Sequence, residues 1–442
     1  MPIVDARVAV GAVLLGAAGW VFAQSVGEDA DLNRIPLAPE AVSPPDASGE
    51  ARAQRLRVED AVNSWNTRTP VLPTPAAQAT WQNRLSLDID IALPLTDTLK
   101  FGFSNRLNVF AGSGLSPASR ANVENDLREI YLSAALARRT YLDVGRLNLK
   151  QGVAYGFNPT DFFKTRTALQ LSSIDPSAAR ENRLGTVMLK AQQLFDEGNV
   201  TLAMAPRVSH ATPLVGSAPA SFDPAWGRTN AENRALLSAS WSASPFNPQL
   251  LVFRDGVGTH WGASVSRVLN ASTVAYAEWS GVREASLAAR AQASDAGRRF
   301  SNDLAVGASW TSSANLTLNA EYNYHARGLD ESDLARAIGQ GAAAQFWFMR
   351  RYAADQQEPF ARRELFLRAD WQDFIPSTLN VGAVAFIAKA DGSALTQVHA
   401  QYFLSRRWTL SAYVGAATGA TSSVFGSLPW RWSTVFQVAR YF

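Results

Sequence analysis

Residues 315–326 read Asn-Leu-Thr-Leu-Asn-Ala-Glu-Tyr-Asn-Tyr-His-Ala, an alternation of apolar and polar residues. Successive side chains of a β-strand point to opposite faces, so this stretch predicts a strand with two unlike faces. One face carries Leu316, Leu318, Ala320, Tyr322 and Tyr324, and the other carries Thr317, Asn319, Glu321, Asn323 and His325. The alternation returns in strand-length segments almost to Phe442, the last residue. Such a chain predicts an all-β, antiparallel up-and-down barrel that spans a membrane, apolar outside and polar within.

The first 75 residues have a different pattern. Arg7 precedes an apolar run, residues 8–20, and Val21-Phe22-Ala23 then offers a signal peptidase site. The run is too short to span a bilayer comfortably, although an uncleaved anchor is the alternative. We predict a signal peptide over 1–23, a Pro-rich periplasmic or lumen-entering segment over 24–75, and the barrel over 76–442. An exported chain that crosses a membrane with strands is expected in the outer membrane of a Gram-negative bacterium.

Composition excludes several kinds of protein. The chain has no Cys and only four His, so we expect no thiolate metal site, no disulfide framework and no cofactor. The hydrophobic fraction of 47% resembles that of a soluble protein, as expected when only half of each strand is apolar. The net charge is +3, but the basic residues are spread along the chain, so no nucleic-acid partner is expected.

Alternation and turn residues mark seventeen strands from Trp81 onward. Bacterial single-chain barrels have an even number of strands, so either residues 55–67 add a strand or one strand has been split in two. We favour 18 strands, with 16 as the alternative. The segment around 55–67 is compatible with a polar helix as well as with a strand.

The strand connections alternate between short and long. Short turns are predicted to face the periplasm and long loops the outside. In the long connection 327–360, residues 329–338 look like a short helix followed by mobile Ala and Gln residues.

Charged and polar residues at the strand period are predicted to line the lumen, because a charge facing lipid near the bilayer midplane costs about 2–4 kcal/mol for Arg. They form either a solute pathway or ion pairs that stiffen the wall. The predicted lumen residues are Arg84, Asp88, Asp90, Arg106, Glu129, Arg207, Glu278, Glu321, His325, Glu364, Arg368, Asp370 and His399.

The most distinctive segment begins at Asp143-Val-Gly-Arg146 and continues Gln151-Gly-Val-Ala-Tyr-Gly-Phe-Asn-Pro-Thr-Asp161. It resembles porin-like outer-membrane channels that carry a strand ending in Gly-Arg, a Gly-rich step and an Asn-Pro-x-Asp loop. The resemblance implies that the loop folds inward and narrows the pore, with Lys150, Asp161, Lys164 and Arg166 as candidate constriction charges. An ordinary surface loop anchored by its Phe residues is the alternative.

The last strand, 430–442, resembles the C-terminal signal of outer-membrane barrels and implies the barrel-assembly machinery as a partner. Phe442 supplies the terminal aromatic, but Arg440 stands where an apolar residue is common. Outer-membrane lipid is the other expected partner, and the 24–75 segment could meet a periplasmic one.

Three functions remain open at this stage. The first is a porin-like channel for passive diffusion or transport of solutes. The second is an export conduit for a lipid or polymer, with the N-terminal segment as plug or docking arm. The third is a barrel enzyme acting on lipid, for which His325 and Glu321 on one strand face are the only tempting pair. A lone lumen His is more often a wall residue, so no catalytic residue and no enzyme activity are predicted.

Overall fold

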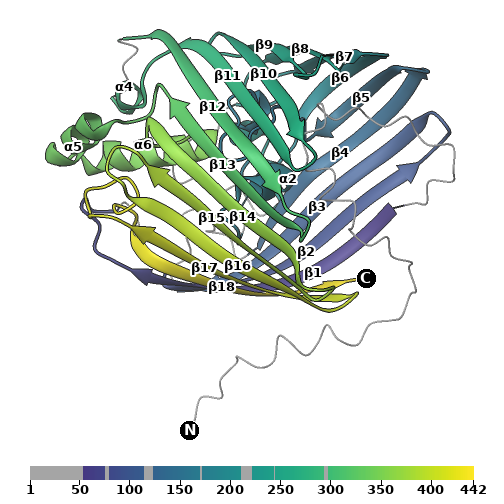
Figure 1. Cartoon of the computed structure of the whole chain (residues 1–442). Helices are drawn as coiled ribbons and strands as arrows, with labels where there is room; N and C mark the ends of the chain where they lie inside the picture. Colours follow the sequence, from purple (N-terminus) through teal and green to yellow (C-terminus); the bar gives the residue numbers. More distant parts are fainter. Residues whose placement is uncertain are drawn as a thin grey trace.

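The computed structural model describes residues 53–74, 79–113, 123–169, 172–210, 222–242, 244–292 and 297–442. These residues form one 18-stranded sheet, which confirms the larger of the two predicted strand numbers. The first strand pairs with both the second and the last, so the sheet closes into a barrel (Figure 1). Neighbouring strands are antiparallel, as in the pairs β2–β3 and β13–β14.

The strands follow one another around the barrel in sequence order. Their bounds are β1 Ala53–Thr67, β2 Trp81–Pro94, β3 Leu99–Gly112, β4 Val123–Ala137, β5 Thr140–Leu147, β6 Thr186–Phe195, β7 Gly198–Ala205, β8 Arg234–Trp241, β9 Gln249–Arg254, β10 Thr259–Asn270, β11 Thr273–Glu284, β12 Arg299–Thr311, β13 Leu316–His325, β14 Arg363–Ile375, β15 Leu379–Ala388, β16 Ala394–Ser405, β17 Trp408–Thr418 and β18 Trp430–Tyr441.

Short turns lie at one rim of the barrel and long connections at the other, which we call the short-turn rim and the long-loop rim. The long connections contain the helices η2 Phe162–Lys164, α2 Pro176–Glu181, α3 Trp226–Thr229, α4 Leu287–Ala291, α5 Glu331–Gly339 and α6 Ala343–Gln356. No helix among the described residues is long and apolar enough to cross a membrane.

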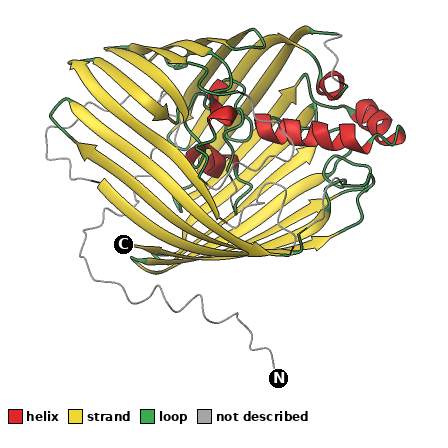
Figure 2. Cartoon of the chain, turned by 180° about the vertical axis from the view of Figure 1, so that it is seen from behind, coloured by secondary structure: helices red, strands yellow, loops and turns green. Residues whose placement is uncertain are grey.

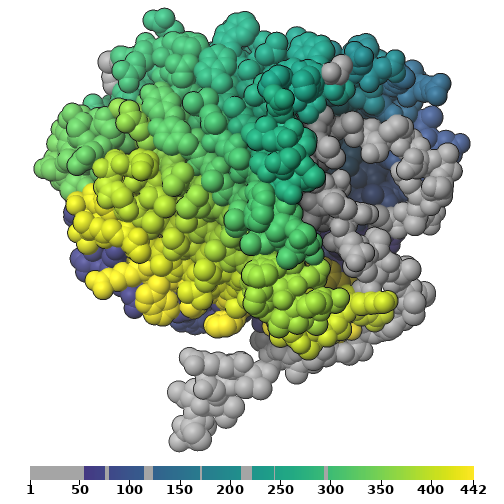
Figure 3. Space-filling model, viewed as in Figure 1, coloured from purple at the N-terminus to yellow at the C-terminus, as the bar shows by residue number. Residues whose placement is uncertain are grey.

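The two faces of β13 are those that the sequence predicts. Leu318, Ala320 and Tyr322 are exposed on the outside, whereas Asn319, Glu321 and Asn323 are buried inside the barrel. Large apolar side chains are exposed in the same way on many other strands, as at Leu237, Val306 and Val398. Figure 3 shows the outer surface of these later strands, coloured green to yellow, as a continuous wall. An apolar outer face over a polar inner face is the arrangement of a barrel in lipid.

The extra strand that the sequence offered over residues 55–67 is present, since β1, Ala53–Thr67, contains these residues and belongs to the barrel wall. The wall therefore includes residues ahead of residue 76, and of the two readings of this stretch, helix or strand, the strand is correct. Residues after β1 also belong to the folded unit, since Leu72 is buried and Trp347 Nε1 donates to the Pro73 carbonyl at 2.9 Å. The predicted signal peptide and residues 24–52 lie outside the described residues.

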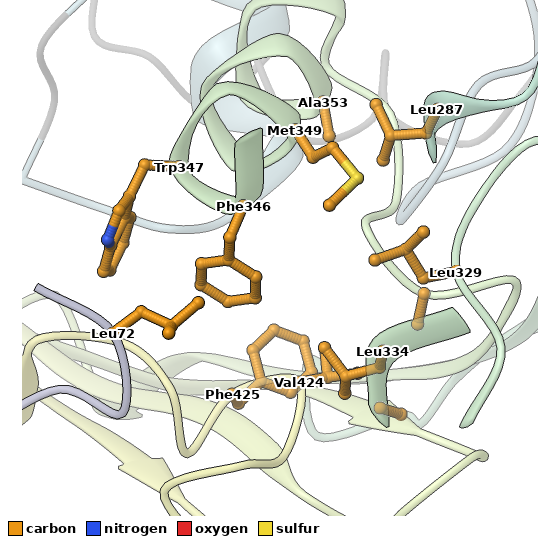
Figure 4. Close-up of a cluster of buried hydrophobic side chains, with 12 residues drawn as sticks. Leu72, Leu287, Leu329, Leu334, Phe346, Trp347, Met349, Ala353, Val424 and Phe425 are labelled. Carbon is orange, nitrogen blue, oxygen red and sulfur yellow. The ribbon is translucent and has the colours of Figure 1, made fainter. Parts of the chain in front are cut away.

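A hydrophobic core at the long-loop rim holds the connections together (Figure 4). Phe346 and Met349 of α6 pack there with Leu334 of α5 and with Phe425 from the β17–β18 connection. The predicted short helix at 329–338 corresponds to α5, but the residues after it are not a mobile tail. They form α6, because burying side chains such as Phe346 gains about 1.5–3 kcal/mol each.

The two ends of β18 lie at opposite rims. Trp432 pairs with Asn66 near the long-loop rim, and Tyr441 pairs with Arg57 near the short-turn rim. The guanidinium of Arg440, the unusual residue in this strand, lies 5.3 Å from the Trp408 ring centroid and 4.5 Å from that of Phe442. Cation–π contacts of this kind let an Arg lie among aromatic side chains.

Candidate pore constriction

The connection between β5 and β6, residues 148–185, lies inside the barrel; we call it the inner segment. Figure 2 shows its helical turns within the ring of strands. Its side chains and backbone contact walls far apart around the barrel: Gln151 meets Gln249 of β9 at 2.8 Å, and Ser172 meets Arg84 of β2 at 3.2 Å. The segment therefore crosses the lumen.

Gly145 and Arg146 direct the chain into the lumen at the end of β5. Gly145 has φ +135°, and a Cβ there would overlap the Ile130 carbonyl oxygen, so only Gly fits. Arg146 is buried, and its guanidinium donates to the carbonyls of Gly185 at 2.9 Å and Pro224 at 2.5 Å. Arg146 therefore links the start of the inner segment to its last residue, Gly185.

Two wall carboxylates hold the middle of the inner segment. Glu278 of β11 accepts hydrogen bonds from the backbone N–H groups of Val153, Ala154 (2.5 Å) and Thr160 (3.2 Å), and from the Thr160 hydroxyl (2.8 Å). Glu321 of β13 accepts from the backbone N–H groups of Tyr155 (2.8 Å), Gly156 (3.1 Å) and Phe157 (2.9 Å). A carboxylate that accepts several N–H bonds makes charge-assisted contacts, which are stronger than neutral ones.

Two glycines allow the backbone of the inner segment to lie close to the barrel wall. A Cβ at Gly156 would overlap atoms of the Phe366 side chain. Gly152 has φ +87°, and a Cβ there would lie 2.5 Å from the Glu278 carboxylate. The glycines that make the sequence distinctive are thus positions where the inner segment touches the wall.

Asp175 anchors the far end of the inner segment to another wall. Its carboxylate accepts from Arg368 Nε of β14 at 2.7 Å and from the Ser177 N–H, where it caps α2, at 2.8 Å. Burial raises the pKa of Asp175, but the Arg368 charge and the hydrogen bonds from Ser177 outweigh it and lower the pKa overall. Arg368 also pairs with Asp370, which lies 3.6 Å from His399 Nε2.

The predicted constriction charges are largely paired within the inner segment or its neighbours. Asp161 is buried and pairs with Arg183 at 2.8 Å. Lys164 donates from Nζ to the Asn158 carbonyl at 2.6 Å, and burial lowers its pKa. Lys150 pairs with Glu181 at 2.7 Å and Arg166 with Asp355 at 3.4 Å. Asp161 and Lys164 therefore stabilise the inner segment, and Lys150 and Arg166 remain partly exposed.

A network of Arg and carboxylate side chains covers the wall formed by β1 to β4. Arg106 pairs with Asp88 through two hydrogen bonds of 2.7 Å, and Arg84 pairs with Glu59 at 2.7 Å. Arg128 lies 3.2 Å from Asp88 and also pairs with Asp90, at 2.9 Å. The planar guanidinium suits such bidentate pairs, which accounts for Arg rather than Lys on this wall.

Sequence reasoning missed two members of this network. Glu59 was not assigned because β1 was not firmly recognised as a strand. Arg128 was missed because the register of β3 and β4 shifts between Ser104 and Asn105. This bulge turns both Arg128 and the predicted Glu129 inward, and Glu129 accepts from the Asn148 N–H at 2.7 Å.

One residue that the sequence placed in the lumen does not lie on the strand wall. Arg207 follows the end of β7 and is exposed in a connection, so it does not line the strand wall.

His325 belongs to a buried ion-pair cluster. Its Nδ1 lies 2.9 Å from Asp303 and its Nε2 lies 3.4 Å from Glu358. These three residues could hold a metal ion by geometry, but Arg327 already pairs with both carboxylates at 2.7 Å. Burial raises the pKa of Glu358, yet the charges of Arg327 and His325 lower it overall. The Arg327 guanidinium compensates the two carboxylates, and the cluster ties β12 and β13 to the connection after α6.

Comparison with known proteins gives a limited result. No family model matches the chain, and no curated protein matches it. Among solved structures, an engineered mutant of the porin from Rh. blastica is 11% identical with a TM-score of 0.43, covering 89% of this chain and 100% of that one. The OmpF protein of Salmonella typhi, in complex with daunomycin, is 11% identical with a TM-score of 0.45, covering 88% and 98%. A likeness this weak carries no argument about function.

Proposed function

We propose that this protein is an outer-membrane channel through which solutes diffuse passively, with the inner segment as its constriction. The observation that carries the proposal is the anchoring of residues 148–185 across the lumen by Glu278, Glu321 and Arg368. A segment held at several points around a polar barrel narrows the passage without depending on a moving plug. The apolar outer face of the barrel supports a place in a membrane.

The mixed charge of the wall supports passage of small polar solutes of either sign. Arg and carboxylate side chains occur in comparable number on β1 to β4 and pair with each other. Their fields largely cancel at a distance, so the wall gives no strong preference for anions or cations.

The test is conductance of the purified protein in planar lipid bilayers. We expect stepwise, lasting current levels from the full-length protein. A second protein, lacking residues 24–52, should conduct in the same way, because the constriction lies in the barrel. The deletion must end before Ala53, since β1 is part of the barrel wall.

An export conduit predicts a different result from a passive channel. If the full-length protein is silent and the deletion variant conducts, the N-terminal segment is a plug and the export conduit becomes the better description. If neither protein conducts although both are folded, the channel proposal is wrong.

A further inference from the structure

A hollow of about 640 Å³ lies at the long-loop rim, where the end of β1 meets the connection between β17 and β18. Its lining includes Arg68 and Arg431, together with the polar residues Asn66, Thr69 and Thr421. Among the described residues, none that lines the hollow carries a carboxylate. The arginines on the wall of β1 to β4 pair with acids, so this hollow differs from that network.

Arg68 is held in a fixed position. Its Nε donates to the Leu428 carbonyl at 2.8 Å, and its Nη2 donates to the carbonyls of Ala417 at 3.1 Å and Phe425 at 3.2 Å. Burial and the nearby charge of Arg431 both lower the pKa of Arg68. Arg68 and Arg431 both line the hollow, and no acid among the described lining residues compensates their repulsion.

Arg431 supplies the second guanidinium group of the hollow. Its side chain is exposed, and it forms no ion pair with a described carboxylate. An anion between the two arginines would remove their repulsion and gain charge-assisted hydrogen bonds.

We propose that this hollow binds a phosphorylated sugar group. The Arg431 guanidinium can offer paired hydrogen bonds to phosphate oxygens, whereas Arg68, whose Nε and Nη2 donate to backbone carbonyls, adds its charge and its Nη1. The volume is within the range of about 300–1,000 Å³ that is usual for small-molecule sites, and it exceeds what a phosphate ion alone would fill. The hydroxyls of the exposed lining residues Thr69 and Thr421 suit the hydroxyl groups of a sugar. The group could come from a free sugar phosphate or from the headgroup of a phosphorylated glycolipid.

Calorimetric titration of the folded protein in neutral detergent tests the site, with glucose 6-phosphate as the free probe and a phosphorylated glycolipid in mixed micelles as the lipid probe. Glucose and the dephosphorylated glycolipid are the controls. We expect a phosphorylated probe to bind and neither control to bind. The affinity for the phosphorylated probe should fall as the salt concentration increases. Arg431→Gln should weaken binding about 10- to 100-fold, as expected for loss of a hydrogen bond between charged groups. Arg407→Gln, an exposed Arg at the short-turn rim, should leave binding unchanged.

The outcomes separate the sources and can overturn the site. Binding of glucose 6-phosphate that Arg431→Gln weakens supports a free sugar phosphate. Binding of the glycolipid alone, weakened by the same variant, supports a lipid headgroup. If neither probe binds, or if Arg431→Gln binds as well as the parent, the site does not exist. Should Arg431→Gln fail to fold, Thr421→Leu narrows the hollow with both charges intact, and unchanged binding by that variant would refute the proposal.

Discussion

The anchoring of the inner segment can be removed with a double substitution, Glu278→Gln and Glu321→Gln. In each glutamine, an NH₂ group replaces one acceptor oxygen and the negative charge is lost. At Glu321, Oε2 accepts from the Tyr155 N–H at 2.8 Å and from the Tyr276 hydroxyl at 3.0 Å, whereas Oε1 accepts from the Phe157 N–H at 2.9 Å. Either orientation of the amide therefore leaves one or two donors without an acceptor.

The magnitude follows from these contacts. A hydrogen bond to a charged group contributes about 1.5–3 kcal/mol, so each substitution should cost roughly 2–5 kcal/mol of anchoring free energy. The two together should cost roughly 4–10 kcal/mol, and about 5.5 kcal/mol is enough to change a 1:99 equilibrium to 99:1. We expect the inner segment of the double variant to leave the wall in most molecules.

Two measurements check this expectation. Single-channel conductance in planar bilayers should rise above that of the parent, with more open-state noise. Trypsin should cut the purified variant within the inner segment, at Arg166 or Arg180, where the parent is protected. Asp143→Asn is the matched control, because Asp143 faces the lumen and pairs with Lys190 at 2.7 Å but does not hold the inner segment. If trypsin shows that the segment is released and conductance nevertheless stays the same, the inner segment is not the constriction.

Three further predictions concern the wall, the inner segment and the topology. Val398→Arg should impair assembly by about 2–4 kcal/mol because Val398 is exposed on the outer face, whereas Gln401→Arg on the inner face of the same strand should assemble; equal tolerance in a urea-refolding assay would contradict the face assignment. Gly156→Ala should displace the inner segment from Phe366 and raise conductance, while Gly339→Ala, which meets nothing within 4 Å, should behave like the parent in the same bilayer recordings. Trypsin added to intact cells should cut at the exposed Arg336 of α5 but reach Arg407 only after the outer membrane is permeabilised; the reverse pattern would invert the barrel.

Much of the barrel could be predicted from the sequence because period-2 alternation is a local property. The faces of β13 and the short turns followed from which residues neighbour each other in sequence. Alternation marked seventeen strands, and the rule that such barrels have an even number favoured the 18 that the structure has. β1 was harder, since Asp60 stands among Leu56, Val58 and Val62 on its outer face and weakens the alternation, whereas Arg55, Arg57 and Glu59 fall on the inner face. Pairing with β2 and β18 decides that these residues form a strand.

The partners of the inner segment could not be read from its own residues. Glycines and an Asn-Pro corner indicate sharp turns, but they do not say which wall the chain will meet. Glu321 lies 166 residues from Tyr155 and 164 residues from Phe157, whose backbone N–H groups donate to its carboxylate. Likewise, Asp161 is buried in an ion pair with Arg183 and is not a free pore charge. Only the folding of the segment brings these two side chains together.

The sequence by itself determined the class of fold, because alternation fixes which side chains face lipid and which face the lumen, and burying a charge in lipid is too costly to be reversed by packing. Only the tertiary structure decided which of the lumen charges anchor the inner segment and which pair along the wall. It also placed Arg68 and Arg431 in one hollow that has no acid among its described lining residues. The reason is that ion pairs and charge-assisted hydrogen bonds depend on distances of a few ångströms between residues that closure of the barrel brings together.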